Sequence, residues 1–500
     1  MRRPMNFFPG PLRPSELRRP ELFHEALARG GYTPDALART IAIGHPSETL
    51  DLELALRRTS PASEYHTLVR LFLLAQSVPE VGARAALEPV GLDELVACGL
   101  LAVEGSNVRS QAKLVPYSGL YCASDFNMTE NRAPLPPEHV LNVGPASITL
   151  ANLSVRTPGG SLFDLGCGSG IQSLLASREC SRVIGSDTSL RALNFASFNS
   201  RLNGCESIEW REGSFFDPVQ TEEFDAVVAN PPFVISPGTR FIFRDGGLGG
   251  DRVSEHVLRG AAARLREGGF ASMLINWHHA DGDWSRRPYE WAADNGCDMW
   301  LILSSDADPL TYAAKWLKQS EGQDSEGYRR RLDEWLAYYE SAGIGRIAAG
   351  EVILRKRAGK NWRRADVMEI FGAAGDCGAH IRQVFANEDF FVALPDDRAL
   401  LGARFRLSES LVVQQDLAWE PGGWTLKKIS LSLAHGLPFG GEGDGAMMRL
   451  LGWMDGTRPL EELLRQLSSA VDLNYERLVD PTLEVLRNLI RATVVIPVDA

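Results

Sequence analysis

The sequence predicts an α/β protein built in three parts. We expect a helical, winged-helix-like domain over residues 1–136, a domain of parallel strands and covering helices over 137–357, and a smaller α+β module over 358–500. The length of 500 residues exceeds what one compact core usually contains. Apolar residues make up 44% and charged residues 23% of the chain, which is a globular composition. In the middle of the chain, short apolar runs alternate with helical patterns, which is typical of a parallel sheet.

The charge and the cysteines exclude several classes of protein. Lys and Arg number 52 against 64 Asp and Glu, and the net charge of −12 excludes bulk electrostatic binding of nucleic acid. The seven cysteines contain no Cys-x-x-Cys pair, which argues against a disulfide framework and against a thiolate zinc site. No stretch approaches the roughly 20 apolar residues of a membrane span, and Met1–Gly10 lacks the apolar core of a signal peptide. We therefore expect a cytoplasmic protein without a metal.

The N-terminal part predicts three short helices followed by a pair of strands. The helices are expected at Glu64–Gln76, Val81–Leu87 and Leu92–Cys98, and the strands at Leu100–Val103 and Val108–Val115. Short helices followed by a two-stranded wing are the outline of a winged helix. Winged helices bind nucleic acid in some proteins and dock domains in others. Because no basic residues mark a recognition helix, the pattern favours docking.

The central part predicts six parallel strands, and a late hairpin closes the sheet. The hairpin is expected from Ile344–Ala349 and Glu351–Arg355, and the charged helical insert at Tyr312–Tyr339 is expected to be a solvated face. The parallel strands are expected at Ser161–Leu165, Val183–Asp187, Ile208–Arg211, Phe224–Asn230, Phe270–Ile275 and Met299–Leu303.

The C-terminal part is less regular. Strands are expected at Phe390–Leu394 and Leu411–Gln415, and the glycine-rich Gly440–Gly445 predicts a linker. Three helices and a terminal strand follow, which again suggests a small winged-helix-like module after residue 445. These elements are expected at Met447–Trp453, Leu460–Ser468, Asn474–Ile490 and Thr493–Pro497.

The strongest signal for chemistry is a glycine-rich loop between the first central strand and the next helix. The sequence runs Asp164-Leu-Gly-Cys-Gly-Ser-Gly170, and Asp187 stands at the tip of the next strand. Glycines let the backbone turn tightly and approach a ligand, and the helix N-terminus adds oriented N–H donors. A carboxylate at the position of Asp187 suits the two hydroxyls of a ribose. The loop is compatible with either a dinucleotide or S-adenosylmethionine.

Two details favour S-adenosylmethionine. A carboxylate at Asp164 would repel a pyrophosphate but suits a cationic ligand. The second detail is Asn230-Pro231-Pro232-Phe233, which follows the fourth strand and therefore lies on the same edge of the sheet as the glycine loop. This pair of motifs resembles the class I S-adenosylmethionine-dependent methyltransferases that carry an Asn-Pro-Pro-Phe/Tyr motif.

The resemblance implies a Rossmann-like seven-stranded sheet, S-adenosylmethionine as cofactor and roles for named residues. By this resemblance, the side-chain oxygen of Asn230 and the carbonyl of Pro231 would accept hydrogen bonds from the two N–H groups of a planar nitrogen. Phe233 would stack on the substrate, and Pro231 and Pro232 would stiffen the loop. The residues implied to bind the cofactor are Asp164, Gly166, Cys167, Gly168, Gly170, Asp187, Ser214, Phe215 and Asn230. Ser214 departs from the acidic residue that the family places there.

The family leaves the substrate open. It includes release-factor glutamine methyltransferases and enzymes that methylate adenine N6 or guanine N2 in rRNA or tRNA. The winged-helix-like domain and the Arg-rich N-terminus slightly favour a nucleobase of RNA. The acidic balance and the glycine-rich Arg244–Arg252 stretch favour a protein glutamine, and a small-molecule substrate remains an alternative. Trp277-His278-His279, after the fifth strand, is expected to form a wall of the substrate pocket rather than a metal site.

Overall fold

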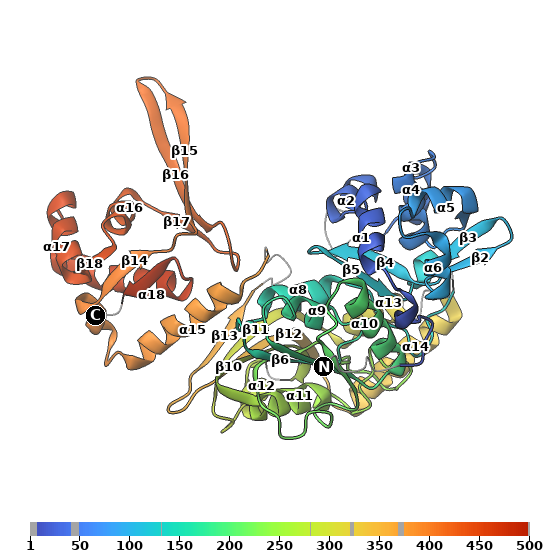
Figure 1. The fold of residues 1–500 in the computed structure, drawn as a ribbon. Coiled ribbons are helices and arrows are strands. Elements are labelled where there is room, and N and C mark those ends of the chain that lie inside the picture. Colours follow the sequence, from blue (N-terminus) through green and yellow to red (C-terminus); the bar gives the residue numbers. More distant parts are fainter. Residues whose placement is uncertain are drawn as a thin grey trace. The chain divides into compact units, whose positions relative to one another are not determined.

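The computed structural model of the chain divides into two compact units (Figure 1). The first unit comprises Met1–Ala151 and Arg156–Met368, and the second comprises Asn152–Val155 and Glu369–Ala500. The N-terminal region and the central sheet therefore share one unit. The structure describes residues 8–41, 50–131, 133–280, 282–320, 325–368 and 375–498.

The first unit is organised around an eight-stranded sheet. Its strands follow the order β13-β11-β12-β10-β9-β6-β7-β8, and neighbours are parallel except that β12 runs antiparallel to both β10 and β11. The strands are β6 Ser161–Leu165, β7 Arg182–Asp187, β8 Glu209–Glu212, β9 Phe224–Ala229, β10 Leu265–His279, β11 Cys297–Ala307, β12 Arg346–Lys356 and β13 Arg363–Val367. The α/β class is confirmed, and each of the six expected parallel strands is present.

The prediction of a late hairpin is wrong, because the whole segment from Arg346 to Lys356 forms the single strand β12. Gly350 lies in the middle of β12 instead of in a turn. A Cβ at this position would stand 1.9 Å from the carbonyl oxygen of Ile302, so the glycine permits a close approach of β11. The sheet also gains β13, which pairs with β11. It therefore has eight strands rather than seven and extends past residue 357.

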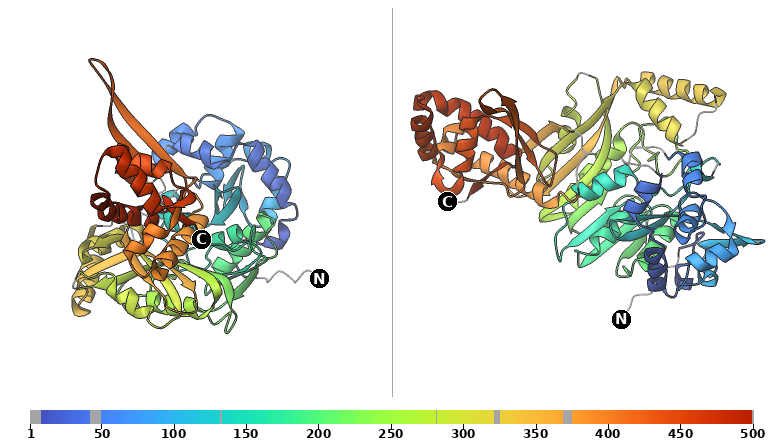
Figure 2. Two further views of the ribbon diagram at one scale, coloured as in Figure 1. Left: turned by 90° about the vertical axis from the view of Figure 1, so that its left-hand side faces the viewer. Right: turned by 90° about the horizontal axis from the view of Figure 1, so that it is seen from above.

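Helices cover the two faces of this sheet, as Figures 1 and 2 show. The covering helices are α8 Pro145–Leu153, α9 Ile171–Ala176, α10 Leu190–Leu202, α11 Arg252–Ala263 and α12 Arg286–Trp291. Because successive strand residues point to opposite faces, Phe163 packs with Val257 of α11, whereas Leu162 packs in the cluster that contains Leu174 of α9 and Leu193 of α10. The near-continuous apolar runs of the sequence arise from this burial on both faces.

The N-terminal region packs against α10 of the same unit. Phe23 and Phe72 share one buried cluster with Phe195 and Phe198 of α10. The region contains η1 Pro14–Glu16, α1 Pro20–Arg29, α2 Pro34–Ile41, α3 Leu52–Arg58, α4 Glu64–Phe72, β1 Val78–Pro79, α5 Glu80–Ala86, α6 Leu92–Ala97, β2 Leu101–Glu104, β3 Asn107–Ser110, β4 Lys113–Tyr117, β5 Leu120–Ser124 and α7 Met128–Asn131. The segment expected as the one strand Val108–Val115 is divided between β3 and β4. From α4 to β3 the chain forms short helices followed by paired strands, which is the order of elements that the winged-helix prediction assumes. The winged-helix assignment itself stays a prediction.

The charged insert between β11 and β12 is solvated on one face only, because most of its charged residues are exposed while several of its aromatic residues are buried. It forms α13 Pro309–Ser320 and α14 Ser325–Ser341. Tyr312, Trp335 and Tyr339 are buried in one cluster with Val234 and Ile235, which follow the Asn-Pro-Pro-Phe motif. The sequence of this segment is dominated by charged residues, but its aromatic face packs onto the rest of the first unit.

The second unit combines helices, a small sheet and a long β-hairpin (Figure 2). Its helices are α15 Gly378–Ala393, η3 Asp397–Gly402, α16 Gly445–Gly452, α17 Leu460–Val471 and α18 Tyr475–Arg491. Its strands are β14 Arg404–Leu407, β15 Leu411–Glu420, β16 Gly423–Leu433, β17 Gly440–Gly443, β18 Asp455–Pro459 and β19 Val495–Val498. The winged-helix-like assignment after residue 445 stays a prediction.

Two expectations for this unit are wrong. The segment Phe390–Leu394 was expected as a strand, but Phe390 to Ala393 complete helix α15. The glycine-rich Gly440–Gly445 is not a linker, since β17 pairs with β16. Asp444 then caps α16, and its side chain accepts a hydrogen bond from the Met447 N–H at 2.8 Å.

Candidate active site

The glycine-rich loop joins the end of β6 to the start of α9. Gly166, Gly168 and Gly170 have φ angles of 69°, 54° and 87°, a left-handed region that favours glycine. A Cβ on Gly170 would also lie 2.8 Å from the Trp210 ring and 3.1 Å from the Cβ of Ala196. The three glycines therefore set the path of the loop, and Gly170 additionally permits close packing behind it.

Asp187, at the end of β7, is connected directly to this loop. Its Oδ2 accepts from the Gly168 N–H at 2.9 Å, and its Oδ1 accepts from the Ser189 N–H at 2.8 Å. Burial raises the pKa of Asp187 above its ordinary value, although these backbone bonds oppose the rise. A carboxylate offers about four acceptor positions. Asp187 can therefore fix the loop and still accept hydroxyl groups from a ligand.

Asp164 holds the other side of the loop. Its Oδ2 accepts from the Ser173 N–H at 3.0 Å and from the Ser173 hydroxyl at 2.8 Å, which ties β6 to the first turn of α9. Burial raises the pKa of Asp164 to about 7. The structure thus gives Asp164 a role in fixing the loop, and its contact with a cationic ligand stays a prediction.

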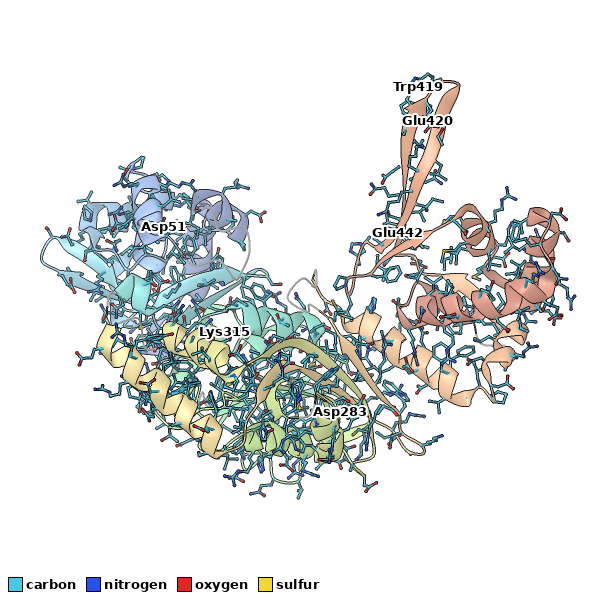
Figure 3. The ribbon with its side chains drawn as sticks, turned by 180° about the vertical axis from the view of Figure 1, so that it is seen from behind. Asp51, Asp283, Lys315, Trp419, Glu420 and Glu442 are labelled. Carbon is cyan, nitrogen blue, oxygen red and sulfur yellow. The ribbon has the colours of Figure 1, made fainter. Side chains whose placement is uncertain are left out.

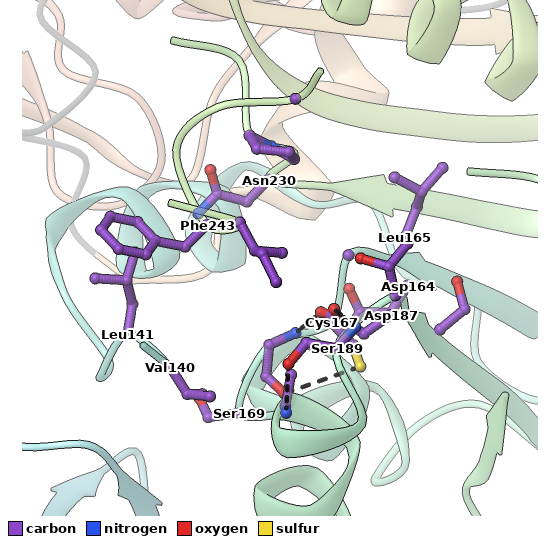
Figure 4. A pocket seen from close by; sticks show the side chains of 18 of the residues that line it. Val140, Leu141, Asp164, Leu165, Cys167, Ser169, Asp187, Ser189, Asn230 and Phe243 are labelled. Carbon is purple, nitrogen blue, oxygen red and sulfur yellow. Dashed lines mark hydrogen bonds between the residues drawn. The ribbon is translucent and has the colours of Figure 1, made fainter. Parts of the chain in front are cut away.

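These groups surround a cavity of about 380 Å³ at the carboxyl edge of the strands. Figure 4 shows Asn230 across this pocket from Asp187 and Ser189. The predicted site residues that line it are Asp164, Gly166, Cys167, Gly168, Asp187, Ser214, Phe215, Asn230 and Pro232. Among the described residues that line the cavity, Gly170, Pro231 and Phe233 are absent.

Phe233 has a partner within the protein. Its ring meets Trp316 of α13 edge to face, with centroids 6.4 Å apart and planes at 72°. Its backbone forms an isolated antiparallel bridge with Asp245. The stacking of Phe233 on a substrate therefore stays a prediction, while its packing against the insert is observed.

Two buried tyrosines of the insert hold the loop that follows the Asn-Pro-Pro-Phe motif. The Ile235 N–H donates to the Tyr312 hydroxyl at 3.2 Å, and the Tyr339 hydroxyl donates to the Ile235 carbonyl at 2.8 Å. The Asn276 side-chain amide, near the end of β10, also donates to the Tyr312 hydroxyl at 2.6 Å. The insert therefore fixes both polar backbone groups of Ile235 and connects this loop to the sheet.

A buried ion pair fixes the next part of the same loop. Arg244 Nε lies 2.8 Å from Asp245 Oδ1, and Arg244 Nη2 lies 3.0 Å from Asp245 Oδ2. Arg244 Nη1 also donates to the hydroxyl of Ser320 in α13 at 2.6 Å. Asp245 accepts from the Ser236 hydroxyl at 2.7 Å and lines the cavity. A buried pair with this many hydrogen bonds specifies one loop conformation.

The mouth of the cavity contains residues that sequence analysis missed. Leu141 and Ile242 are exposed and line it together with Phe243 and His139. The Ile242 N–H donates to the carbonyl of Pro137 at 3.1 Å, and the rings of His139 and Phe243 meet edge to face at 5.7 Å. Apolar residues in irregular segments carry no periodic signal, so only the fold reveals that the segments around residues 139 and 242 meet.

Two other predicted regions behave differently. Phe215 has a positive φ of 47°, lines the cavity and meets the His256 ring edge to face at 4.5 Å. Trp277 is buried in the core rather than in a pocket wall, and its Nε1 donates to the Trp284 carbonyl at 2.6 Å. His278 and His279 lie near Asp251 and Asp306 respectively, outside the cavity lining. In the part of the chain that the structure describes, no group of three or more His, Cys, Asp or Glu side chains could hold a metal ion.

The fold and the loops define the class to which the site belongs, and comparison with known proteins agrees. Residues 142–281 match the family described as the methyltransferase small domain. This match confirms, for that segment, the resemblance to S-adenosylmethionine-dependent methyltransferases. Residues 21–111 and 382–497 match two domains of unknown function, DUF7059 and DUF7782. Across the described residues, no helix is both long and apolar enough to cross a membrane.

The more specific likenesses are partial. The release factor glutamine methyltransferase of Xylella fastidiosa is 30% identical over 129 residues, which cover 23% of this chain and 46% of that protein. The ribosomal protein L11 methyltransferase of Caldanaerobacter subterraneus is 39% identical over 74 residues, covering 15% of this chain and 24% of that protein. The chain thus spans about half, or less, of the relatives it matches. The crystal structure of the ribosomal protein L11 methylase of Lactobacillus delbrueckii has a TM-score of 0.23 and 20% identity, over 31% of this chain and 68% of that one.

Proposed function

We propose that the chain transfers a methyl group from S-adenosylmethionine to the side-chain amide nitrogen of a protein glutamine. The observation that carries this proposal is the chemistry of the cavity. Asn230 lines it together with four carboxyl groups, those of Glu138, Asp164, Asp187 and Asp245, and its described lining contains no Lys or Arg.

The residues present fit S-adenosylmethionine. Asp187 has acceptor positions left for the hydroxyls of a ribose. Phe215 offers an apolar surface in the lining, which suits a planar base. The acidic lining suits a positively charged ligand. When bound, this cofactor supplies an electrophilic methyl group on a sulfonium cation.

The same lining favours an uncharged substrate group. The described lining offers no Lys or Arg to bind a phosphate. Asp245 is already paired with the buried Arg244, but the carboxyl groups of Glu138 and Asp187 would repel a phosphate. A glutamine amide is planar and neutral, and its nitrogen presents two N–H donors to the oxygen of Asn230 and the carbonyl of Pro231. We therefore favour the protein substrate over the nucleobase that the sequence slightly favours.

The chain's own residues would act by positioning the nitrogen and excluding water. Asn230 and Pro231 would accept hydrogen bonds from the two N–H groups of the amide, which would increase the electron density on its nitrogen. Leu141, Ile242 and Phe243 at the mouth would exclude water from the nitrogen. The nitrogen can lose its proton after methylation, so the site needs no strong base. The relatives' names support the same substrate class, since they act on a release factor and on a ribosomal protein.

A labelling experiment tests the proposal. The full chain and radiolabelled S-adenosylmethionine would be incubated with separate protein, RNA and small-molecule fractions of a cell lysate. Label should enter protein, and mass spectrometry should place the methyl group on a glutamine side chain. Asn230→Ala should lower the rate of transfer far more than it weakens cofactor binding measured by calorimetry, whereas Asn107→Ala, in strand β3, should leave both unchanged. Label found only in RNA or in small molecules would refute the proposed substrate.

A further inference from the structure

The hairpin formed by β15 and β16 carries an exposed apolar face at its far end. Leu417, Trp419, Trp424 and Leu426 retain exposed fractions of 52%, 66%, 68% and 44%. Trp419 pairs with Trp424 across the hairpin, with ring centroids 5.6 Å apart, and Leu417 pairs with Leu426. Figure 3 shows Trp419 and Glu420 at the far end of the hairpin and Glu442 near its base. Contiguous exposed apolar groups of this size mark interaction surfaces.

The base of the same apolar face is covered by the hairpin's own unit. Leu431 is buried there, and Leu411 and Leu433 pack against the same core cluster, as do Met447 and Met448 of α16. Residues 411, 413, 415, 417 and 419 share one face of β15 because side chains alternate along a strand, and all of them except Gln415 are apolar. The unit therefore covers the lower half of one continuous face and leaves the upper half exposed.

The hairpin does not have the charge of a nucleic-acid-binding arm. Residues 411–433 contain two acidic and two basic side chains. Lys427 is paired with Glu420, and Lys428 lies 2.7 Å from Glu442. Proteins that bind single-stranded nucleic acid through exposed tryptophans also present unpaired cationic side chains, which neutralise the phosphates. Because carboxylates neutralise both lysines, the tip favours a protein partner.

The strand β15 is also an open edge. In the described part of the chain it pairs with β16 alone, over ten residues that contain neither Lys nor Pro. Its two charged residues are Asp416 and Glu420, and an edge of this length without lysine or proline is suited to pair with another strand. The side chains of β15 are self-complementary when two copies run antiparallel about Gln415. Val413 then faces Leu417 of the second copy, Leu411 faces Trp419, and Gln414 faces Asp416.

We propose that β15 pairs with β15 of a second copy of this chain, in an antiparallel and two-fold symmetric contact. In this arrangement the tip of each hairpin lies beside the base of the other. The body that covers the base of one arm then also covers the exposed tryptophans of its partner. The hairpins carry no net charge, so the two copies do not repel each other. This inference is independent of the proposed methyl transfer.

Sedimentation equilibrium of the full chain tests the contact. The wild type should form a species of twice the 54.9 kDa chain mass. Leu417→Lys puts a cation in the paired face and Gln415→Pro removes a strand donor, so each should weaken the dimer about tenfold or more. Ser432→Lys, on the neighbouring strand β16, is the matched control and should remain dimeric. Thermal unfolding should confirm that all variants fold.

Three results would overturn the inference. The first is a wild type that stays monomeric up to its solubility limit. The second is a dimer that persists in both Leu417→Lys and Gln415→Pro, because it would then use another surface. The third is a monomer whose tryptophan fluorescence changes on binding a single-stranded oligonucleotide or a lipid vesicle, an effect lost in Trp419→Ala. That result would assign the tip to base stacking or to a membrane instead.

Discussion

The hydroxyl of Tyr339 provides a direct test of how the insert controls the candidate active site. Tyr339→Phe removes the donor to the Ile235 carbonyl, a bond of 2.8 Å inside a buried cluster, and leaves the ring packing intact. Leaving a buried acceptor without a partner costs about 1–3 kcal/mol. Ile235 lies in the loop that carries Asn230, so this cost falls on the conformation that presents the motif.

The expected effect is a lower rate of methyl transfer with unchanged cofactor binding. If the loss of about 1–3 kcal/mol is expressed fully in the barrier, kcat falls roughly 5- to 150-fold. Tyr312→Phe should have a larger effect, because the Tyr312 hydroxyl accepts from both Ile235 and Asn276. The assay is initial-rate transfer of label to the protein substrate, beside calorimetric titration with S-adenosylmethionine. Tyr328→Phe, in the same helix α14, is the matched control and should match the wild type.

Two outcomes would refute this reasoning. A kcat of Tyr339→Phe equal to that of wild type would mean that the loop does not depend on this bond. An equal weakening of transfer and of cofactor binding would mean that the bond supports the whole unit rather than the loop. If the wild type transferred no methyl group, the failure would instead concern the proposed function.

Three further changes test other parts of the structure. Gly170→Ala should destabilise the chain by about 1–3 kcal/mol more than Gly204→Ala in urea unfolding, because both positions have positive φ but only Gly170 faces Trp210 closely. Asp187→Ala should weaken S-adenosylmethionine binding about tenfold or more in calorimetry, whereas the exposed Asp217→Ala should not, and equal affinities would refute the assignment. Burial raises the pKa of Glu351 in the folded chain far above its ordinary value of 4.5. Above pH 4.5 the carboxyl therefore loses its proton in the unfolded chain but keeps it in the folded chain, and the free energy of unfolding falls as the pH rises. Glu351→Gln should flatten this decline in unfolding measured between pH 5 and 8, while the exposed Glu104→Gln should keep the wild-type slope.

The sequence predicts the sheet and the core of the site because both depend on local patterns. Strands buried on both faces are near-continuous apolar runs, as β6 and β9 show. Gly166, Gly168 and Gly170 occupy left-handed conformations that few other residues adopt. The motif and Asp187 then lie at one sheet edge, since carboxyl ends of parallel strands meet there.

Long-range contacts account for the expectations that the structure overturns. A glycine such as Gly350 usually indicates a turn. Its place inside a strand is explained only by the close approach of the Ile302 carbonyl oxygen on the neighbouring strand. The insert is highly charged, and the burial of Trp335 and Tyr339 becomes visible only when Val234 and Ile235 lie against them. The sequence predicts that the ring of Phe233 is available to stack on a substrate. It does not show that Trp316, more than eighty residues away, packs against this ring.

The insert also separates two tasks within the candidate site. Its tyrosines hold the loop that follows the Asn-Pro-Pro-Phe motif through the backbone groups of Ile235. The mouth is built from Leu141, Ile242 and Phe243, of which Ile242 and Phe243 lie farther along the same loop. Substitutions at the exposed Leu141 and Ile242 are therefore expected to change which substrates enter, with a smaller effect on kcat than Tyr339→Phe.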